Sequence, residues 1–343
     1  MIGLGIVGTD HLAIRMIKCV AQVEGVRVTA IASTKQGPAG PLADPLGAAV
    51  CADPAELASR PDVDAVYVNN SGPYHADAVR VAIAAGKPVL VQKPIALTVP
   101  ETEEIVALAR KAGVLLVENL WCLTVPAAQT LIARADTAAM GKPHAFSLDF
   151  GFPVKPELYP ALFSPELGVL RDRAGYGIAL ARRLLGPVAD LTAQVNWLGN
   201  VDTSAMILLR HRSGAMSKLG FSFDALMSNK ATLACSGGLY RLEPSLGGTS
   251  LMSQVAEAQI GPLTKPPRRR IASLTMGKAL RRFSRTPKAA RYPLGSDLHL
   301  PMLRHFVDLV RAGRPESPLV PLDLSVETQR LVEQARTRVD LAA

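Results

Sequence analysis

The sequence lacks a long apolar run and a dense set of cysteines, and each absence excludes a class of protein. No apolar stretch in the 343-residue chain reaches the roughly 18–20 residues that a membrane-spanning helix needs. The N-terminus has no basic stretch followed by a long apolar one, so a secretory signal is not expected. The four cysteines lie far apart, and no pair has the spacing of a metal site. We therefore expect a cytoplasmic protein with reduced cysteines, no metal site and no membrane contact.

Acidic residues are missing from one region of the chain. Ten Lys and Arg residues and no Asp or Glu occur between Gly261 and Tyr292, whereas the whole chain has a net charge of +9. The rest of the chain is therefore close to neutral. We predict that 261–297 is a basic loop insertion with one short helix. Few aromatic residues and no nucleic-acid motif accompany these charges, so nucleic acid is not an expected partner. A loop over the active site that binds a phosphorylated substrate is an alternative.

The composition and the order of elements predict two domains. Hydrophobic residues make up 48% of the chain and charged residues 20%, which is enough to bury a large core. Over residues 1–120, short apolar strands alternate with helical patterns, which indicates a doubly wound parallel sheet with helices on both faces. The expected strands are Ile2–Val7, Val26–Ala32, Val63–Asn70, 87–94 and Val114–Asn119, and the expected helices are Leu12–Val23, Ala76–Ala85 and Thr98–Gly113.

After Trp121 the pattern changes to consecutive strands around glycine turns. Such a pattern is typical of an α+β domain with a large, open, mostly antiparallel sheet, which we assign to residues 121–343. The expected strands lie at 144–152, 204–223 and 230–244, and the expected helices at Pro126–Asp136, Asp172–Leu185, Leu298–Ala312 and Ser325–Arg338.

The turn after the first strand is typical of a dinucleotide-binding fold but has lost one glycine. A nominal G-x-G-x-x-G starts at Gly3, but no strand precedes it, so it is not the fingerprint. The correctly placed turn is Gly8–Ala13, which reads G-x-D-x-x-A. Asp10 stands where a glycine normally lets the backbone approach the pyrophosphate. Either Asp10 caps the helix and occupies the amides that a phosphate would use, or its carboxylate points away and a phosphate still binds more weakly. The expected cofactor-binding residues here are Gly8, Thr9, Asp10, His11 and Leu12.

The end of the second strand bears on which nicotinamide cofactor is used. An NAD-preferring site usually has an acidic residue there for the ribose 2′-hydroxyl. This strand is followed instead by Ser33, Thr34 and Lys35, whose hydroxyls and cation suit a 2′-phosphate. The sequence therefore favours NADP(H), with NAD(H) as the alternative cofactor and a solvated loop as the structural alternative.

The stretch DAVYVNNSGPYHADAVRVAIAAGKPVLVQKPIALT, with the link VENLWCLTVPA and the final RAGRPESPLVPLDLSVETQRLVEQAR, resembles a known family. It is similar to the glucose-fructose oxidoreductase/inositol dehydrogenase (Gfo/Idh/MocA) family of NAD(P)-dependent oxidoreductases, over nearly the whole chain. The family lysine is present, whereas the family glutamate before it is a glutamine here. His75 would form an edge of the cleft or simply begin a helix. The resemblance implies cofactor contacts from Asn70, Ser71, His75, Gln92, Lys93 and Pro94.

The catalytic residues are expected in GVLRDRAGYGIALARRLLG. The family has an Asp here and a His or Tyr four residues on, which are Asp172 and Tyr176 in this chain. The Asp-Tyr form resembles the branch of dihydrodiol dehydrogenases and sugar ketoreductases. Residues four apart lie on one helix face, so both side chains should point into one cleft. Lys93 can then donate to a developing alkoxide, Tyr176 can act as the acid or base, and Asp172 can orient one of them.

The charges around these residues matter for that chemistry. Arg171 and Arg173 flank Asp172 and should help to keep it ionised if they point toward it. Burial and nearby positive charge are expected to bring the pKa of Tyr176 toward neutrality. The structural alternatives are a solvated strand end for Lys93, a core aromatic for Tyr176 and a helix cap for Asp172.

Two functions from different classes follow from these patterns. The leading one is an NADP(H)-dependent oxidoreductase that transfers a hydride between nicotinamide and a sugar, polyol or related cyclic hydroxy or keto compound. The alternative, motivated by Asp10 and Gln92, is a non-catalytic ligand-binding or regulatory relative with a weakened cofactor site. The partner is expected to be a small-molecule substrate. Since the family often associates through its second-domain sheet, a homodimer or homotetramer is also expected.

Overall fold

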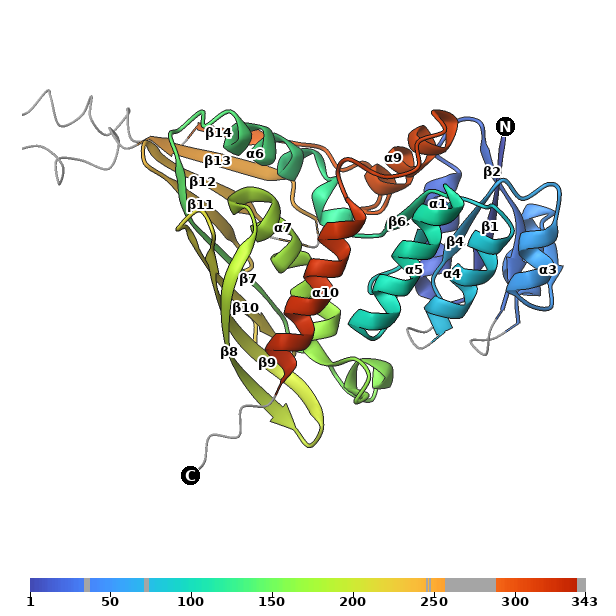
Figure 1. Ribbon diagram of the computed structural model, residues 1–343, viewed down its shortest axis with the longest axis horizontal. Helices are drawn as coiled ribbons and strands as arrows, with labels where there is room; N and C mark the ends of the chain where they lie inside the picture. The colour runs from blue at the N-terminus through green and yellow to red at the C-terminus, as the bar shows by residue number, and fades with distance from the viewer. Residues whose placement is uncertain (34–37, 71–73, 245, 247, 257–287, 338–343) are drawn as a thin grey trace, which may run out of the picture.

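The chain forms two sheets, which lie at opposite ends of the molecule with helices between them (Figure 1). The computed structural model describes residues 1–343 apart from 34–37, 71–73, 245, 247, 257–287 and 338–343. No helix in the described part of the chain is both long and apolar enough to cross a membrane.

The N-terminal sheet has six parallel strands in the order β3-β2-β1-β4-β5-β6. This is the doubly wound order of a Rossmann fold, in which ligands bind outside the carboxyl ends of the strands where the chain changes direction, here between β1 and β4. The prediction of a parallel Rossmann sheet is confirmed. Its strands are β1 (Ile2–Val7), β2 (Val26–Ala32), β3 (Ala49–Cys51), β4 (Ala65–Val68), β5 (Val89–Val91) and β6 (Leu116–Glu118).

Helices cover both faces of this sheet because successive strand residues point to opposite sides. Leu4 and Ile6 of β1 join a core with residues of α1, whereas Val7 of the same strand joins a second core with residues of α3, α4 and α5. The helix expected over Thr98–Gly113 is α5, and its ends are capped: Thr98 accepts from the amide of Glu101, and Gly113 ends the helix at a φ of 65°. The helices are α1 (His11–Val20), α2 (Gly40–Ala43), η1 (Asp44–Leu46), α3 (Pro54–Ser59), α4 (His75–Ala84) and α5 (Val99–Ala112).

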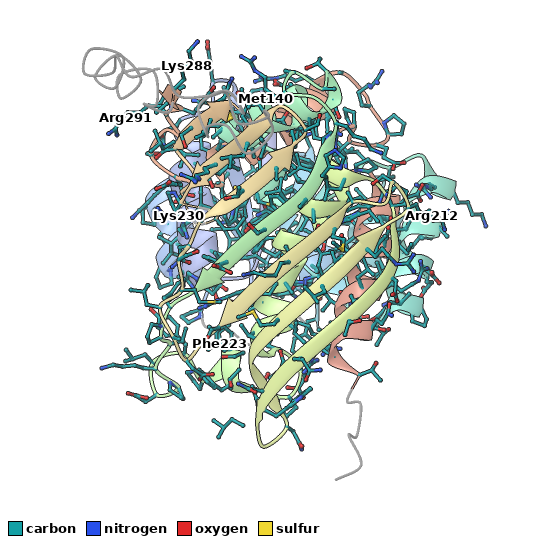
Figure 2. The ribbon with its side chains drawn as sticks, turned by 90° about the vertical axis from the view of Figure 1, so that its left-hand side faces the viewer. Met140, Arg212, Phe223, Lys230, Lys288 and Arg291 are labelled. Atoms are coloured by element: carbon teal, nitrogen blue, oxygen red, sulfur yellow. The ribbon has the colours of Figure 1, made fainter. Side chains whose placement is uncertain are left out.

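The second sheet has eight strands in the order β14-β13-β12-β11-β7-β10-β9-β8. All its neighbours pair antiparallel except β7 and β10, which confirms a mostly antiparallel sheet. One face of it is free of helices among the described elements and faces the viewer in Figure 2. The strands are β7 (Pro143–Gly151), β8 (Val188–Leu198), β9 (Val201–His211), β10 (Met216–Ser222), β11 (Ala231–Cys235), β12 (Gly238–Glu243), β13 (Leu251–Ala256) and β14 (Lys288–Arg291).

The expected basic loop at 261–297 needs a correction, because part of it is a strand. Residues Lys288–Arg291 form β14, which pairs antiparallel with β13. All four side chains are exposed, so the segment has no apolar alternation, and backbone pairing with a distant strand decides its conformation. The expected short helix and most of the positive charge fall within 257–287, outside the described residues.

Helices of the second half of the chain pack between the two sheets. α7 and α10 pack against each other, with α7 on β7 and β10, and α10 on β8. The end of the chain also returns to the Rossmann domain, since α9 packs on α1 and α10 packs on α5 and β6. The division at residue 120 therefore remains a prediction. The elements are η3 (Trp121–Leu123), α6 (Pro126–Asp136), η4 (Pro160–Phe163), η5 (Leu170–Ala174), α7 (Gly175–Leu185), α9 (Leu300–Arg311) and α10 (Leu322–Arg336).

One buried ion pair fixes α10 to the second sheet and gives a test of this packing. Asp202 at the start of β9 is fully buried, and its two oxygens accept from Arg336 at 2.9 Å and from the amide of Leu170 at 2.6 Å. We expect Arg336→Ala to lower the free energy of unfolding by roughly 3–5 kcal/mol, because it leaves a buried carboxylate without its cation. Arg330→Ala on the same helix removes a mostly exposed pair with Glu103 and should cost about 1 kcal/mol or less. Equal losses in denaturant unfolding would contradict this account.

Candidate active site

Lys93 lies two residues after β5 and reaches across to the second half of the chain. Its ammonium donates to the carbonyl oxygen of Asp172 at 2.6 Å and to that of Arg171 at 3.3 Å. It also forms an ion pair with the Asp172 carboxylate at 3.2 Å and lies 5.2 Å from the ring centroid of Tyr176. The side chain is only 13% exposed. The structure thus brings together the three residues that the sequence proposed as catalytic.

The backbone that meets Lys93 is not the regular helix that was expected over Asp172–Leu185. Leu170–Ala174 forms a turn of π-helix, and the α-helix starts only at Gly175. Such wide turns are rare in proteins as a whole, but many of those that occur lie at functional sites. The sequence pattern could not show it, because four-residue spacing brings side chains to a similar face in both geometries. Here the wide turn directs two carbonyl oxygens and one carboxylate at the same ammonium.

The two arginines beside Asp172 point in different directions. Arg173 is buried, and its guanidinium points toward Asp172 and lies 3.6 Å from the carboxylate. It stacks on the rings of Phe150, Phe152 and Phe223 and donates to the carbonyl of Ser222. Burial lowers the pKa of Arg173 to about 10, which still leaves it a cation at neutral pH. Arg171 instead donates to the carbonyls of Glu166 and Leu97.

Tyr176 is buried beside Trp121, with ring centroids 4.9 Å apart. Burial raises the pKa of Tyr176 well above its ordinary value, and the negative charge of Asp172 adds to the effect. The expectation that its pKa moves toward neutrality is therefore wrong, because removal from water disfavours a phenolate more than the nearby cations favour it. Tyr176 is a neutral phenol that can donate a proton.

His75 and Gln92 are buried next to the turn that carries Lys93. His75 is the first residue of α4, is buried, and makes a hydrogen bond through Nδ1 to the carbonyl of Pro94 at 2.8 Å. Burial lowers the pKa of His75, so the ring is neutral near pH 7. Gln92 is also buried, and its amide donates to the hydroxyl of Tyr67 at 2.7 Å. These contacts place both side chains in the packing beneath the strand ends, and their part in cofactor binding remains a prediction.

Asp10 caps helix α1 in the first of the two ways considered. Its Oδ1 accepts from the amides of Leu12 at 2.8 Å and Ala13 at 3.2 Å, and from the side chain of Asn69 at 2.7 Å. The carboxylate therefore occupies two of the helix N-terminal amides that a pyrophosphate would otherwise use. His11 is the first residue of the helix, and its side chain is exposed.

The turn nevertheless keeps features that fit a dinucleotide. Gly8 has a φ of 124°, and a Cβ there would lie 2.2 Å from the Asn69 side chain, so only glycine fits. The buried side-chain oxygens of Asn69 and Asn70, directly after β4, have no hydrogen-bond partner within the described structure. Buried oxygens without partners at the switch point of the sheet suit a ligand with donor groups.

Some expected cofactor contacts cannot be placed. Ser33 directly follows β2 at the same edge of the sheet, whereas Thr34, Lys35 and Ser71 lie outside the described residues. Among the residues that are described, no group of three or more His, Cys, Asp or Glu side chains could hold a metal ion. All four cysteines are free thiols.

Several residues at the cleft were not singled out from the sequence. Three of them lie at or just after the end of β6, namely Glu118, Asn119 and Trp121. The fourth, His299, comes from the C-terminal part of the chain. Trp121 contacts His299 edge to face at 6.2 Å, and His299 makes a hydrogen bond to Asn119 at 3.2 Å. Glu118 and Asn119 could have been found, because polar residues at the carboxyl end of a parallel strand mark the binding edge. His299 gives no such signal, since it comes from 180 residues further along the chain.

Comparison with known proteins places this geometry in context. Residues 1–120 match the profile of an oxidoreductase family with an NAD-binding Rossmann fold, and residues 128–241 match the GFO/IDH/MocA C-terminal domain. Trans-1,2-dihydrobenzene-1,2-diol dehydrogenase of Oryctolagus cuniculus is 27% identical over 83% of this chain and 81% of that protein. The dTDP-3,4-didehydro-2,6-dideoxy-alpha-D-glucose 3-reductase of Saccharopolyspora spinosa is 31% identical over 64% of this chain and 68% of that protein.

A solved structure resembles this chain along almost its whole length. The crystal structure of a 3-ketoreductase from Actinomadura kijaniata in complex with NADP superposes with a TM-score of 0.74 at 26% identity and covers 98% of this chain and 97% of that one. Two matching domain profiles and relatives along most of the chain agree with the fold. The chain belongs to the Gfo/Idh/MocA family of oxidoreductases.

Proposed function

We propose that the protein is an NADP(H)-dependent oxidoreductase that acts on a sugar, polyol or related cyclic hydroxy or keto compound. The observation that carries the proposal is the convergence of Lys93, Asp172 and Tyr176 at the carboxyl edge of the Rossmann sheet. The named substrates of its relatives, a cyclic dihydrodiol and a keto sugar nucleotide, support a ring carbinol or ketone as the reacting group.

At the substrate oxygen, one side chain stabilises the developing charge and another transfers a proton. The nicotinamide, when bound, supplies the hydride. In the reducing direction, Lys93 stabilises the negative charge that develops on the oxygen, and Tyr176 donates its phenolic proton there. Asp172 orients the ammonium, and Arg173 forms an ion pair with Asp172 from the other side of the carboxylate. In the oxidising direction the step reverses, and Tyr176 takes up the proton of the substrate hydroxyl in its deprotonated form.

Residues around the turn after β1 would hold the dinucleotide. Gly8, Thr9, His11 and Leu12 lie at the N-terminus of α1, and Asn70 lies at the end of β4. Ser33, with Thr34 and Lys35, would contact the 2′-phosphate, which makes NADP(H) the preferred cofactor. The solved reductase that binds NADP supports this preference.

Asp10 is expected to weaken cofactor binding without preventing it. Asp10→Gly removes a negative charge beside the pyrophosphate site and frees two amides. We expect it to tighten NADPH binding about five-fold, since one charge at a helix N-terminus is worth up to about 1 kcal/mol. The cost in stability should be only a few tenths of a kcal/mol.

A matched control separates this effect from general loss of a helix cap. Asp53 caps α3 by accepting from the amide of Glu56 at 2.8 Å, and its helix does not begin at the switch point. Asp53→Gly should leave NADPH affinity unchanged in a fluorescence titration. Weaker binding by the Asp10→Gly variant would contradict the account of Asp10.

The catalytic assignment predicts large losses of rate from small changes. We expect Lys93→Met and Tyr176→Phe each to lower kcat by roughly 10²–10⁴-fold, the usual contribution of a positioned acid–base group. NADPH binding should persist in both variants. The measurement is NADPH-dependent reduction of a panel of keto sugars and cyclic ketones.

Lys87→Met is the control for Lys93→Met, because it also removes a partly buried lysine that donates to backbone carbonyl oxygens. Its ammonium also donates to two carbonyl oxygens, those of Val63 at 2.6 Å and Arg60 at 3.3 Å, but at the opposite end of the strands. Lys87→Met should keep the rate of the unaltered protein. If the unaltered protein binds NADPH but turns over none of the panel, the non-catalytic alternative is favoured.

We further propose that the protein is a cytoplasmic homodimer or homotetramer that associates through the open face of the second sheet. This face carries exposed apolar side chains on β9 and β10, namely Met206, Leu208 and Met216, at 48%, 55% and 63% exposure (Figure 2). Exposed apolar patches of this kind mark interaction surfaces. Sedimentation should show an oligomer that Leu208→Asp dissociates and that Leu226→Asp, in the loop after β10, does not. A monomer alone would refute association.

A further inference from the structure

Glu118 is a buried acid that the catalytic scheme above does not use. It is the last residue of β6 and only 5% exposed, and its Oε2 has no hydrogen-bond partner in the described structure. Burial raises the pKa of Glu118 from the ordinary value of 4.5 to about 7. A carboxyl group in this position is therefore present in both charged and neutral forms near neutral pH.

The groups that face Glu118 connect it to the catalytic residues. β5 lies beside β6, with Val91 paired to Glu118, and the positive charge of Lys93 just after β5 favours the Glu118 carboxylate. In turn, the Glu118 charge acts on Tyr176 of α7 and on the Cys122 thiol of η3. α10 presents the Ser325 hydroxyl and no charged group to it.

Ser325 lets both forms of Glu118 persist. Its hydroxyl lies close enough to stabilise the Glu118 carboxylate, yet it has no hydrogen bond of ordinary geometry in the described structure. A hydroxyl can donate to a carboxylate or accept from a carboxylic acid. It can therefore follow the protonation of Glu118 without rearrangement of the backbone. A buried carboxylate is normally held by a full set of hydrogen bonds. The Ile95 amide and the Ser325 hydroxyl lie near the Glu118 carboxylate, but its Oε2 has no partner in the described structure.

We propose that Glu118 is a positioning residue that holds a proton behind Lys93 and Tyr176 and exchanges it with solvent. Its charge then sets the electrostatic field in which the ammonium and the phenol act on the substrate oxygen. No bond to the substrate forms or breaks at Glu118, and the proton that it loses goes to water. The inference rests on the proposed function, because it concerns the same reaction.

The first test follows the proton itself and needs no substrate. Infrared titration of the full chain should show the carbonyl stretch of a buried carboxylic acid that disappears as the pH rises through about 7. The band should be absent in Glu118→Gln and shifted in Glu118→Asp, which covers the case in which one variant fails to fold. A band that does not titrate, or that remains in both variants, overturns the proposal whatever the activity.

Stability must change with pH in a defined direction. Between about pH 4.5 and 7 the folded protein keeps the Glu118 proton that the unfolded chain has lost. Stability therefore falls as the pH rises through this window. Relative to the unaltered protein, Glu118→Gln should gain stability over the same window. A constant difference between the two proteins at all pH values contradicts the titration of Glu118.

The second test links the proton to the reaction. The pH profile of kcat/KM of the unaltered protein should have an inflection near 7 that Glu118→Gln lacks, with plateau rates within about ten-fold. Ser325→Ala should move the inflection to higher pH, because it removes a hydroxyl that favours the Glu118 carboxylate. Superimposable profiles of Glu118→Gln and the unaltered protein overturn the coupling to Lys93. No turnover by the unaltered protein, with a titrating infrared band, instead refutes the proposed function and leaves the proton-holding role supported.

Discussion

The contact between the Lys93 ammonium and the π-helical turn at Leu170–Ala174 is the interaction on which the site depends. It joins the carboxyl edge of the Rossmann sheet to the helical segment that leads into α7. A regular α-helix would use its carbonyl oxygens along its own axis, whereas the wide turn aims two of them at one cation. The same contact brings Asp172 and Tyr176 to that cation. Geometry and charge at the proposed reaction centre are thus set by one piece of backbone.

Burial explains why the charges around this contact behave differently from one another. Arg173 is removed from water but keeps its charge, because three phenylalanine rings and a carboxylate surround it. Tyr176 is removed from water and stays neutral, because burial disfavours the phenolate and the negative charge of Asp172 adds to that effect. Glu118 lies between these extremes, with a pKa raised to about 7. The site therefore contains Arg173 as a cation, Tyr176 as a neutral proton donor and Glu118 as an acid with a pKa of about 7.

Much of the fold could be predicted from the sequence, because the capping residues and the periodic spacing of apolar residues indicated the same helices and strands. Thr98 and Gly113 bound α5 as their capping chemistry requires, and the parallel order of the first sheet followed from alternating strands and helices. β14 could not be predicted, since four exposed residues in a basic segment carry no strand pattern and depend on pairing with β13. β8 was missed although Leu191, Ala193, Val195 and Trp197 alternate with exposed residues, as a strand covered on one face requires.

The candidate site was predictable in its members but not in its geometry. Lys93, Asp172 and Tyr176 were identified from motif and spacing, yet spacing could not distinguish a π turn from an α-helix. It could not choose between the two orientations of Asp10, which depend on Asn69 from a strand 59 residues away. The direction of the Tyr176 pKa shift depends on burial by Trp121, which no local pattern reveals. Each miss concerns a contact between distant parts of the chain.

The central claim is that a Rossmann turn carrying Asp10 still binds a nicotinamide cofactor beside Lys93 and Tyr176. The most direct measurement is a fluorescence titration of the purified, full-length protein with NADPH and, separately, with NADH. The account predicts saturable binding of NADPH and clearly weaker binding of NADH, since Ser33, Thr34 and Lys35 offer no acidic group to a ribose 2′-hydroxyl. No binding of either cofactor at millimolar concentration would contradict it.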